Sequence, residues 1–265
     1  MSRTTLTALR YAGISALNDL SAIYTWKTWT FGWLSRVLCQ VAFFAVIGRL
    51  LGSPETTHYL LIGNAVVIAV MESAFVNASS SWERGLGTLP LLVAAPTNLF
   101  VVFVGRSIQW IISGVACSTI ALYALAPLFG VPLHWPTALL AVPLIILVSL
   151  SSYCLALTLA GLVLRAPMVR NIVGNLTWWT VALVGGVQVP TDFWPSWVRV
   201  TGAVLPLTHG LDGVRTALAG GSVARIGRDA LLEVAVGGLW LIVAALSFRW
   251  LAEGGRKTGT IEFGE

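Results

Sequence analysis

Six long apolar runs constrain the fold of this chain more than any other feature of its sequence. A helix needs about 20 mostly apolar residues to cross the hydrocarbon core of a bilayer. The runs have roughly that length and cover residues 34–51, 59–78, 98–125, 137–163, 170–189 and 230–251. Only 10% of the residues are charged, whereas about 25% is usual in a soluble domain. We therefore predict an all-α membrane protein with six transmembrane helices, in which residues 1–265 form a single transmembrane domain.

The loops between the runs predict the orientation of the chain. The segments 52–58 and 126–136 contain no Lys or Arg, whereas 79–97 and 164–170 do. Loops that carry Lys and Arg stay on the cytoplasmic side of a membrane. Both termini are therefore predicted to be cytoplasmic, in a multi-pass protein of a bacterial plasma membrane. The external segment 190–229 does not follow the rule, because it contains four arginines beside three aspartates.

The formal net charge of +5 does not indicate a nucleic-acid partner. Lys and Arg stand at the ends of the apolar runs, where they orient a membrane protein. Cys39, Cys117 and Cys154 lie inside apolar runs and are interpreted as small core residues. No metal site is predicted, since the three histidines are far apart in the sequence.

Two segments are too polar or too interrupted to span the membrane. Residues 4–30 have the apolar spacing of an amphipathic helix, which lies in the inner membrane interface or covers the protein's own surface. The segment 190–229 shows two short helical patterns, at 195–204 and 208–219, and we interpret it as a re-entrant helix pair at the outer surface. Its interrupting prolines are Pro190, Pro195 and Pro206. The predicted domain thus consists of an interfacial helix (1–33), spans one to five (34–189), the external segment (190–229), span six (230–251) and a cytoplasmic tail (252–265).

The cytoplasmic segment 83–96 has the pattern of a short capped helix. Gly87 permits a tight turn, and the Thr88 hydroxyl can accept a hydrogen bond from a free backbone N–H at the helix start. Leu89 and Leu92 then share one apolar face, and Pro96 ends the helix. Such a helix either fits a groove on another protein or lies against this protein's own surface.

Polar side chains inside the apolar runs are candidates for a substrate pathway, because polar groups in hydrocarbon are costly and usually face a cavity or the bundle interior. Asn171, Asn175 and Trp178 follow helical spacing and share one face. The alternative role is interhelical hydrogen bonding, which Asn and Gln also provide in membranes. The candidates in the second and fifth spans are Asn64, Glu72, Asn171, Asn175, Trp178 and Gln188.

Two carboxylates inside the spans need an explanation of their own. Three explanations are open for Glu72: it lies near the cytoplasmic boundary, it is protonated, or it pairs with Arg84 or Arg106. For Glu233 in the last span, Arg228 is the candidate partner.

Two stretches of the sequence carry motifs with characteristic spacing. The first is Glu83-Arg84-Gly-x-Gly87-Thr88-Leu89-x-x-Leu92-x-x-Ala95-Pro96, followed by Gly105-Arg106. The second is Pro190-x-x-x-x-Pro195-x-Trp197, followed by Leu205-Pro206-Leu207-Thr208-His209-x-Leu211-x-x-x-Arg215. Both resemble signature segments of the type 2 family of ABC export permeases. The order of the predicted segments is similar too, so the resemblance covers almost the whole chain.

The resemblance implies a permease subunit with no enzyme activity of its own. In the family, the loop that matches 83–96 is a coupling helix that docks on a separate ATPase subunit, and the turn at Arg165 would be a second, smaller contact. The chain contains no GxxxxGK[ST] phosphate loop. We therefore expect no cofactor on this chain, and ATP and Mg on an ATP-binding partner present in two copies or equivalents.

The resemblance also implies a second permease subunit, either identical or related. In the family, the second and fifth spans of the two subunits face each other along one pathway, and membrane lipid surrounds the pair. The chain departs from the family at Pro90, where many members have Glu, and at Ala95, where many have Thr. A missing acidic residue would weaken one contact to the ATPase. We therefore hypothesise a heterodimer with a more regular permease.

Members of the family export drugs, antibiotics, lipids or lipid-linked glycans. The N-terminal segment is only mildly basic and contains Trp26 and Trp29, which favours a small amphipathic drug, antibiotic or metabolite and a role in drug efflux or antibiotic resistance. The alternatives are a lipid or lipid-linked glycan exporter and a non-transporting sensor or immunity subunit. A membrane-embedded hydrolase is disfavoured, because no Gly-x-Ser-x-Gly elbow accompanies the histidines.

Overall fold

The computed structural model describes residues 3–85, 99–164 and 167–258, and these ranges contain helices and connecting turns but no strands. The predicted all-α class is therefore confirmed for the part of the chain that the structure describes. The helices are α1 (Arg3–Ile23), α2 (Ser35–Leu50), α3 (Pro54–Gly85), α5 (Leu99–Ser107), α6 (Gln109–Leu128), α7 (Ala141–Val163), α8 (Arg170–Val184), α9 (Ser196–Ala203), α10 (Thr208–Leu218) and α11 (Val223–Thr258). A π-helical turn, Thr28–Leu34, leads directly into α2.

Within the described ranges, five helical stretches are long and apolar enough to cross a membrane. They are Thr28–Leu50, Pro54–Asn77, Leu99–Leu128, Thr137–Gly161 and Val223–Leu251. The predicted fifth span, 170–189, corresponds to α8, which has 15 residues and is followed by a turn. A helix of 15 residues is shorter than the bilayer core requires, so the six-span layout stays a prediction.

The centre of the bundle is α3. Every residue from Leu60 to Val70 is buried, as expected for a helix that is apolar on all sides. Helices α2, α6, α7 and α8 pack around it. In contrast, α11 leaves apolar side chains such as Leu231 and Leu246 exposed, which is the pattern of a helix that faces lipid.

Small residues let the helices approach closely, as is usual in membrane bundles. A Cβ added at Gly48 on α2 would lie only 2.5 Å from the Cα of Thr57 on α3. On the other side of the bundle, a Cβ at Gly161 on α7 would lie 2.2 Å from the Ser247 hydroxyl of α11. Gly48 could not be replaced without separating its helix pair, whereas a side chain at position 161 would first require the Ser247 hydroxyl to move.

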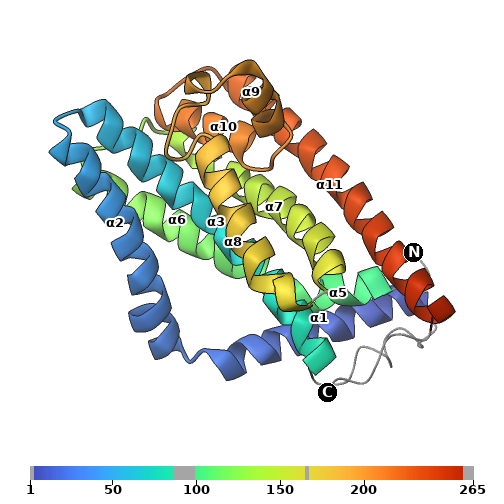
Figure 1. Ribbon diagram of the computed structural model, residues 1–265. Coiled ribbons are helices and arrows are strands. Elements are labelled where there is room, and N and C mark those ends of the chain that lie inside the picture. Colours follow the sequence, from blue (N-terminus) through green and yellow to red (C-terminus); the bar gives the residue numbers. More distant parts are fainter. Residues whose placement is uncertain (1–2, 86–98, 165–166, 259–265) are drawn as a thin grey trace.

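Helix α1 crosses the end of the bundle opposite to α9 and α10 (Figure 1). Its Ala12 and Ala16 are buried, because α1 packs against α5, and Asp19 forms an ion pair with Arg106 of α5 at 3.4 Å. Its other face exposes Tyr11. The predicted helix therefore exists and rests partly on the protein itself, while its place in the membrane interface stays a prediction.

The boundaries of several predicted segments change. The third span is interrupted at Ile108, which separates α5 from α6. The last helix begins at Val223, so the external segment is shorter than 190–229. The two short helical patterns at 195–204 and 208–219 are confirmed as α9 and α10. Of the three cysteines expected in the core, Cys39 is exposed, because it lies on the outer face of α2.

Candidate functional site

An open groove with a volume of about 500 Å³ runs between α2, α3 and α8. Its walls combine amide side chains with aromatic rings and one guanidinium group. They consist of Arg36, Gln40 and Phe44 from α2, Met71, Ala74, Phe75 and Asn77 from α3, and Asn171, Gly174, Asn175, Trp178 and Trp179 from α8. We call this the α2–α3–α8 groove. Its size falls within the range of about 300–1,000 Å³ that is typical of small-molecule sites.

Helix α8 supplies the side of the groove that the sequence points to most clearly. Asn171, Asn175 and Trp178 are four and three positions apart, so a helix places them on one face, and all three line the groove. Trp179 joins them, and its ring meets that of Trp178 edge-on at a centroid distance of 4.4 Å. The structure thus brings three of the six candidate pathway residues together.

Among the described residues that line the groove, Arg36 alone carries an ionic side chain. Its guanidinium lies 4.5 Å from the ring centroid of Trp33, and no carboxylate of the described residues pairs with it. Sequence reasoning missed Arg36 as a site residue, because an Arg at the start of a span is usually an orienting charge.

Glu72 lies behind this wall and does not line the groove. It is 1% exposed, and its carboxylate accepts a hydrogen bond from the indole N–H of Trp33. Arg106, one of its expected partners, instead pairs with Asp19. The side chain of Arg84, the other expected partner, lies outside the described residues.

Two groups at the base of the groove lack hydrogen-bonding partners. Asn77 is 3% exposed, and both its amide nitrogen and its amide oxygen are buried without a partner in the described part of the chain. The indole nitrogen of Trp178 is in the same state. Most buried polar groups in proteins are paired, so both groups have hydrogen-bonding capacity left for a ligand, as do Gln109 and Ser149 elsewhere in the bundle. In the sequence, Asn77 stands out only as a polar residue inside the apolar run 59–78. That position does not reveal which side chains surround it.

Asn64 and Gln188 form a reciprocal amide pair away from the groove. The Gln188 amide donates to Asn64 Oδ1 at 3.0 Å, and Asn64 Nδ2 approaches Gln188 Oε1 at 3.5 Å. Asn64 also donates to the backbone carbonyl of Leu60 at 2.8 Å. These contacts give both residues the alternative role of structural hydrogen bonding, but between α3 and the turn after α8 and not between two helices.

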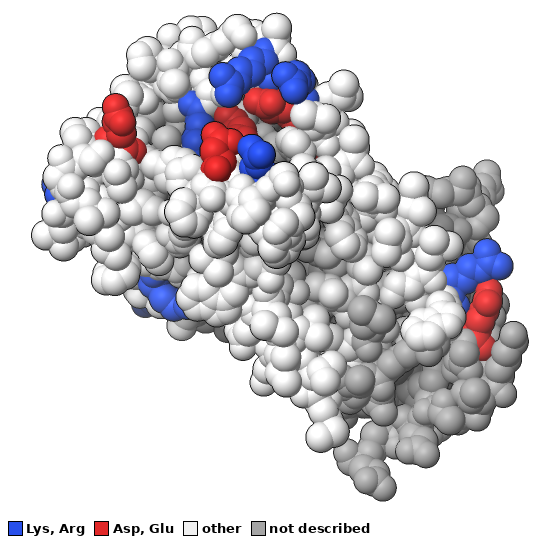
Figure 2. Space-filling model, turned by 45° about the horizontal axis from the view of Figure 1, so that its top comes forward, with Lys and Arg blue, Asp and Glu red and all other residues white. Residues whose placement is uncertain are grey.

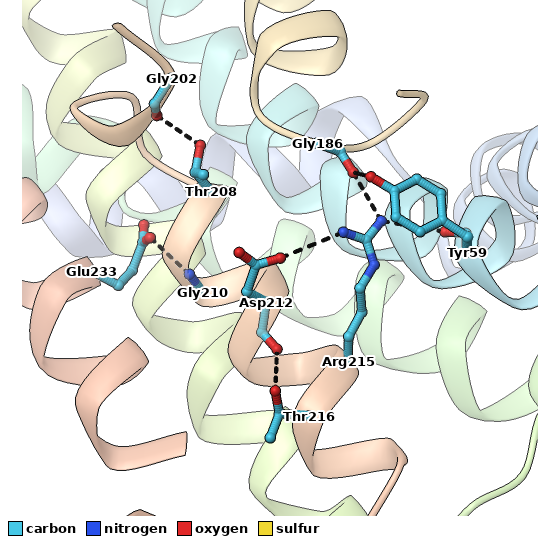
Figure 3. A network of polar contacts seen from close by, with 9 residues as sticks. All are labelled: Tyr59, Gly186, Gly202, Thr208, Gly210, Asp212, Arg215, Thr216 and Glu233. Carbon is cyan, nitrogen blue, oxygen red and sulfur yellow. Dashed lines mark hydrogen bonds and ion pairs between the residues drawn. The ribbon is translucent and has the colours of Figure 1, made fainter. Parts of the chain in front are cut away.

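At the opposite end from α1, a polar network joins α10 to α3 and to the turn after α8 (Figure 3). Arg215 donates to the carbonyl of Gly186 at 2.8 Å, stacks 3.7 Å from the ring centroid of Tyr59 and lies 3.6 Å from Asp212. Burial lowers the pKa of the Arg215 guanidinium, and the neighbouring Tyr59 and Asp212 side chains oppose that shift. The network fixes the predicted external segment onto the bundle.

Glu233 of α11 holds the start of α10. Its carboxylate accepts hydrogen bonds from the backbone N–H groups of Leu207 and Gly210, each at 3.0 Å, and from the Ser151 hydroxyl. The structure thus gives Glu233 backbone partners in place of the expected Arg228. Free N–H groups at the start of a helix are good partners for a carboxylate.

The remaining predicted residues of the external segment have local roles. His209 contacts the carbonyl of Ala203 at 3.0 Å. Pro195 stands at the N-cap position of α9, Pro190 precedes a turn of 3₁₀ helix, and Pro206 lies buried between α9 and α10. Many of the charged side chains on the face shown in Figure 2 form one group in its upper part, and most of the described surface around that group is white.

The predicted coupling residues are only partly described. Glu83 and Arg84 belong to the last turn of α3, with side chains outside the described residues. Gly87, Thr88, Leu89, Leu92, Pro96 and Arg165 also lie outside them.

Comparison with known proteins agrees with the resemblance found in the sequence. A family model for the ABC-2 type transporter matches residues 14–219, well over half of the chain. No curated protein matches the sequence. The apolar helices and this match make the chain a multi-pass membrane protein and a permease component of an ABC transporter, a kind of protein that works with an ATP-binding subunit. The chain belongs to the ABC-2 type transporter family.

Proposed function

We propose that this permease exports a small amphipathic molecule, such as a drug, antibiotic or metabolite, through the α2–α3–α8 groove. The observation that carries the proposal is the lining of that groove, where Asn171 and Asn175 stand beside Trp178 and Trp179. Amide groups bind the polar part of an amphipathic molecule, and indole rings bind its apolar part. Polar side chains within spans mark transport pathways in many membrane proteins.

The energy for transport would come from ATP, bound with Mg on a separate chain. We propose that the segment 83–96 docks as a coupling helix in a cleft of that ATPase, with Arg165 as a smaller second contact. Leu89 and Leu92 would supply the apolar face that enters the cleft. A second permease subunit would complete the pathway, and Pro90 favours a related partner over a second copy of this chain.

The test uses the complete transporter with its ATPase, reconstituted in inverted vesicles with an amphipathic fluorophore. Wild-type complexes should accumulate the fluorophore when ATP is supplied. Asn175→Ala and Trp178→Ala should each reduce the initial rate by about tenfold, which corresponds to about 1.4 kcal/mol of lost interaction. Trp197→Ala is the matched control, since Trp197 on α9 is exposed and lies outside the groove. ATP-driven uptake that is equal in all four proteins would refute the proposed pathway.

A further inference from the structure

We propose that the α2–α3–α8 groove selects amphipathic acids, which are molecules with an apolar or aromatic body and one anionic head such as a carboxylate, sulfonate or phosphate. This inference rests on the proposed function, because it names the substrate class of the same groove. It is carried by the charge of the lining, by unpaired donors at its base and by the aromatic groups of its walls.

The first step is the charge balance of the groove. Arg36 contributes a positive charge to the lining, and within the part of the chain that the structure describes no Asp or Glu lines the groove. Glu72 lies behind the lining, where it is buried and accepts a hydrogen bond from the indole N–H of Trp33. The guanidinium of Arg36 lies over the ring of the same indole. An anionic head would therefore meet an accessible guanidinium, whereas a cationic head would be repelled by it.

The second step is the supply of hydrogen-bond donors. The Asn77 amide and the Trp178 indole N–H are buried and unpaired. Both residues also line a small cavity of about 10 Å³ behind the groove, whose wall adds the unpaired hydroxyl of Ser152. Three neighbouring unpaired groups are costly to bury, and each can donate a hydrogen bond. After a small rotation of their side chains, the Asn77 amide and the Trp178 indole, which line the groove, could donate to a head rich in acceptor oxygens, whereas Ser152 lines only the small cavity.

The third step concerns the body of the molecule. Phe44, Phe75 and Trp179 form apolar walls around the polar base, and the Phe75 ring continues the aromatic surface to Trp33 at a centroid distance of 5.4 Å. A flat aromatic body can stack on such walls. The groove volume of about 500 Å³ holds two or three fused rings with a short acidic arm.

A matched set of three fluorophores tests this selectivity by direct binding, without ATP. Dansylglycine is anionic at pH 7, dansylamide is neutral and N-(2-aminoethyl)dansylamide is cationic, and all three share one ring system. Binding to the full-length permease in discs of neutral phosphatidylcholine would be measured by fluorescence titration. The expected order of affinity is anionic, then neutral, then cationic, with about tenfold between the first and the last.

Variants assign the selectivity to residues. Arg36→Gln should remove the preference for the anionic probe and leave the neutral probe within twofold. Arg49→Gln is the control, because Arg49 lies near the other end of the same helix and outside the groove. Trp178→Phe removes only the indole donor, and it should weaken the anionic probe about fivefold while leaving the neutral probe within twofold. Should Arg36→Gln fail to fold, Trp178→Phe still decides the question.

Three results would overturn the inference: equal binding of all probes, tighter binding of the cation, or an acid preference that survives both Arg36→Gln and Trp178→Phe. A second arm adds phosphatidylglycerol to the discs. If phosphatidylglycerol competes with the anionic probe, and Arg36→Gln abolishes that competition, the natural ligand is a lipid with an anionic headgroup. If it does not compete, the natural ligand is a soluble acid. Binding is measured without ATP and without the ATPase. The binding result can therefore be interpreted even if the transport test fails.

Discussion

The guanidinium of Arg215 donates a 2.8 Å hydrogen bond to the backbone carbonyl of Gly186 and so ties α10 to the turn that follows α8. The same carbonyl accepts the Tyr59 hydroxyl of α3 at 2.5 Å. Three segments that are far apart in the sequence therefore meet at one backbone oxygen, at the end of the molecule where α9 and α10 lie.

Loss of this contact should destabilise the protein measurably. Arg215→Met leaves part of the network unpaired, and we expect a loss of about 1.5–3 kcal/mol, the usual value for a hydrogen bond to a charged group. The measurement is thermal unfolding in detergent. Arg199→Gln on the exposed face of α9 is the control and should change the free energy of unfolding by less than about 0.5 kcal/mol. Equal effects of both substitutions would show that the network does not hold α10.

Among the acidic residues in the described part of the chain, replacement of Glu233 should cause the largest loss in the free energy of unfolding. Glu233→Gln replaces an oxygen that accepts backbone N–H groups by an amide nitrogen that cannot, so buried donors of α10 remain unpaired. We expect a loss of roughly 3 kcal/mol. The matched control is Glu253→Gln, whose solvent-exposed pair with Arg249 should contribute little to stability. A Glu233 variant as stable as this control would contradict the capping role.

Two asparagines on α3 should respond in opposite directions to the same substitution. Asn64→Leu breaks a paired amide, whereas Asn77→Leu removes an unpaired one. Replacement of an unpaired buried polar group by an apolar one is neutral or stabilising. We therefore expect Asn77→Leu to raise the melting temperature while weakening the binding of dansylglycine, and Asn64→Leu to lower it. A loss of stability in Asn77→Leu would show that this amide has a structural partner.

The pairing of Asn64 with Gln188 can be measured separately. A double-mutant cycle with Asn64→Leu and Gln188→Leu should give a coupling energy of about 0.6 kcal/mol, the average for such pairs in membranes. Additive effects would mean that the two amides act independently and that their contact does not join α3 to the turn after α8.

Local sequence patterns predicted the parts of the fold that depend on local chemistry. Apolar runs indicated the long helices, and the prolines around Pro195 and Pro206 indicated two short ones. The break at Ile108 and the early end of α8 were missed, although Ser107 and Gln109 flank the first and Gly185 and Gly186 follow the second, because glycines and single polar residues also occur inside unbroken membrane helices. The spacing of Asn171, Asn175 and Trp178 placed one wall of the groove. The opposite wall was missed, since nothing near Arg36 in the sequence shows that α2 faces α8 across the groove.

The partners of the buried carboxylates were unpredictable for a related reason. Arginines were the obvious candidates for Glu72 and Glu233, because charge is the only partner visible in a sequence. The structure instead uses the Trp33 indole and the backbone N–H groups of Leu207 and Gly210. Backbone donors become available only where a helix starts, and which helix start meets which side chain is decided by tertiary packing.

The central claim is that a separate ATPase drives this permease through the apolar face of the segment 83–96. The most direct measurement is ATP-driven uptake by the reconstituted complex that carries Leu89→Asp and Leu92→Asp together, beside a control with Leu50→Asp and Leu51→Asp, two exposed leucines at the end of α2. The account predicts that the first double variant loses at least about 90% of uptake, as expected when charges enter an apolar docking site, while the control keeps most of it. Uptake at the wild-type rate in the Leu89→Asp, Leu92→Asp complex would contradict the account.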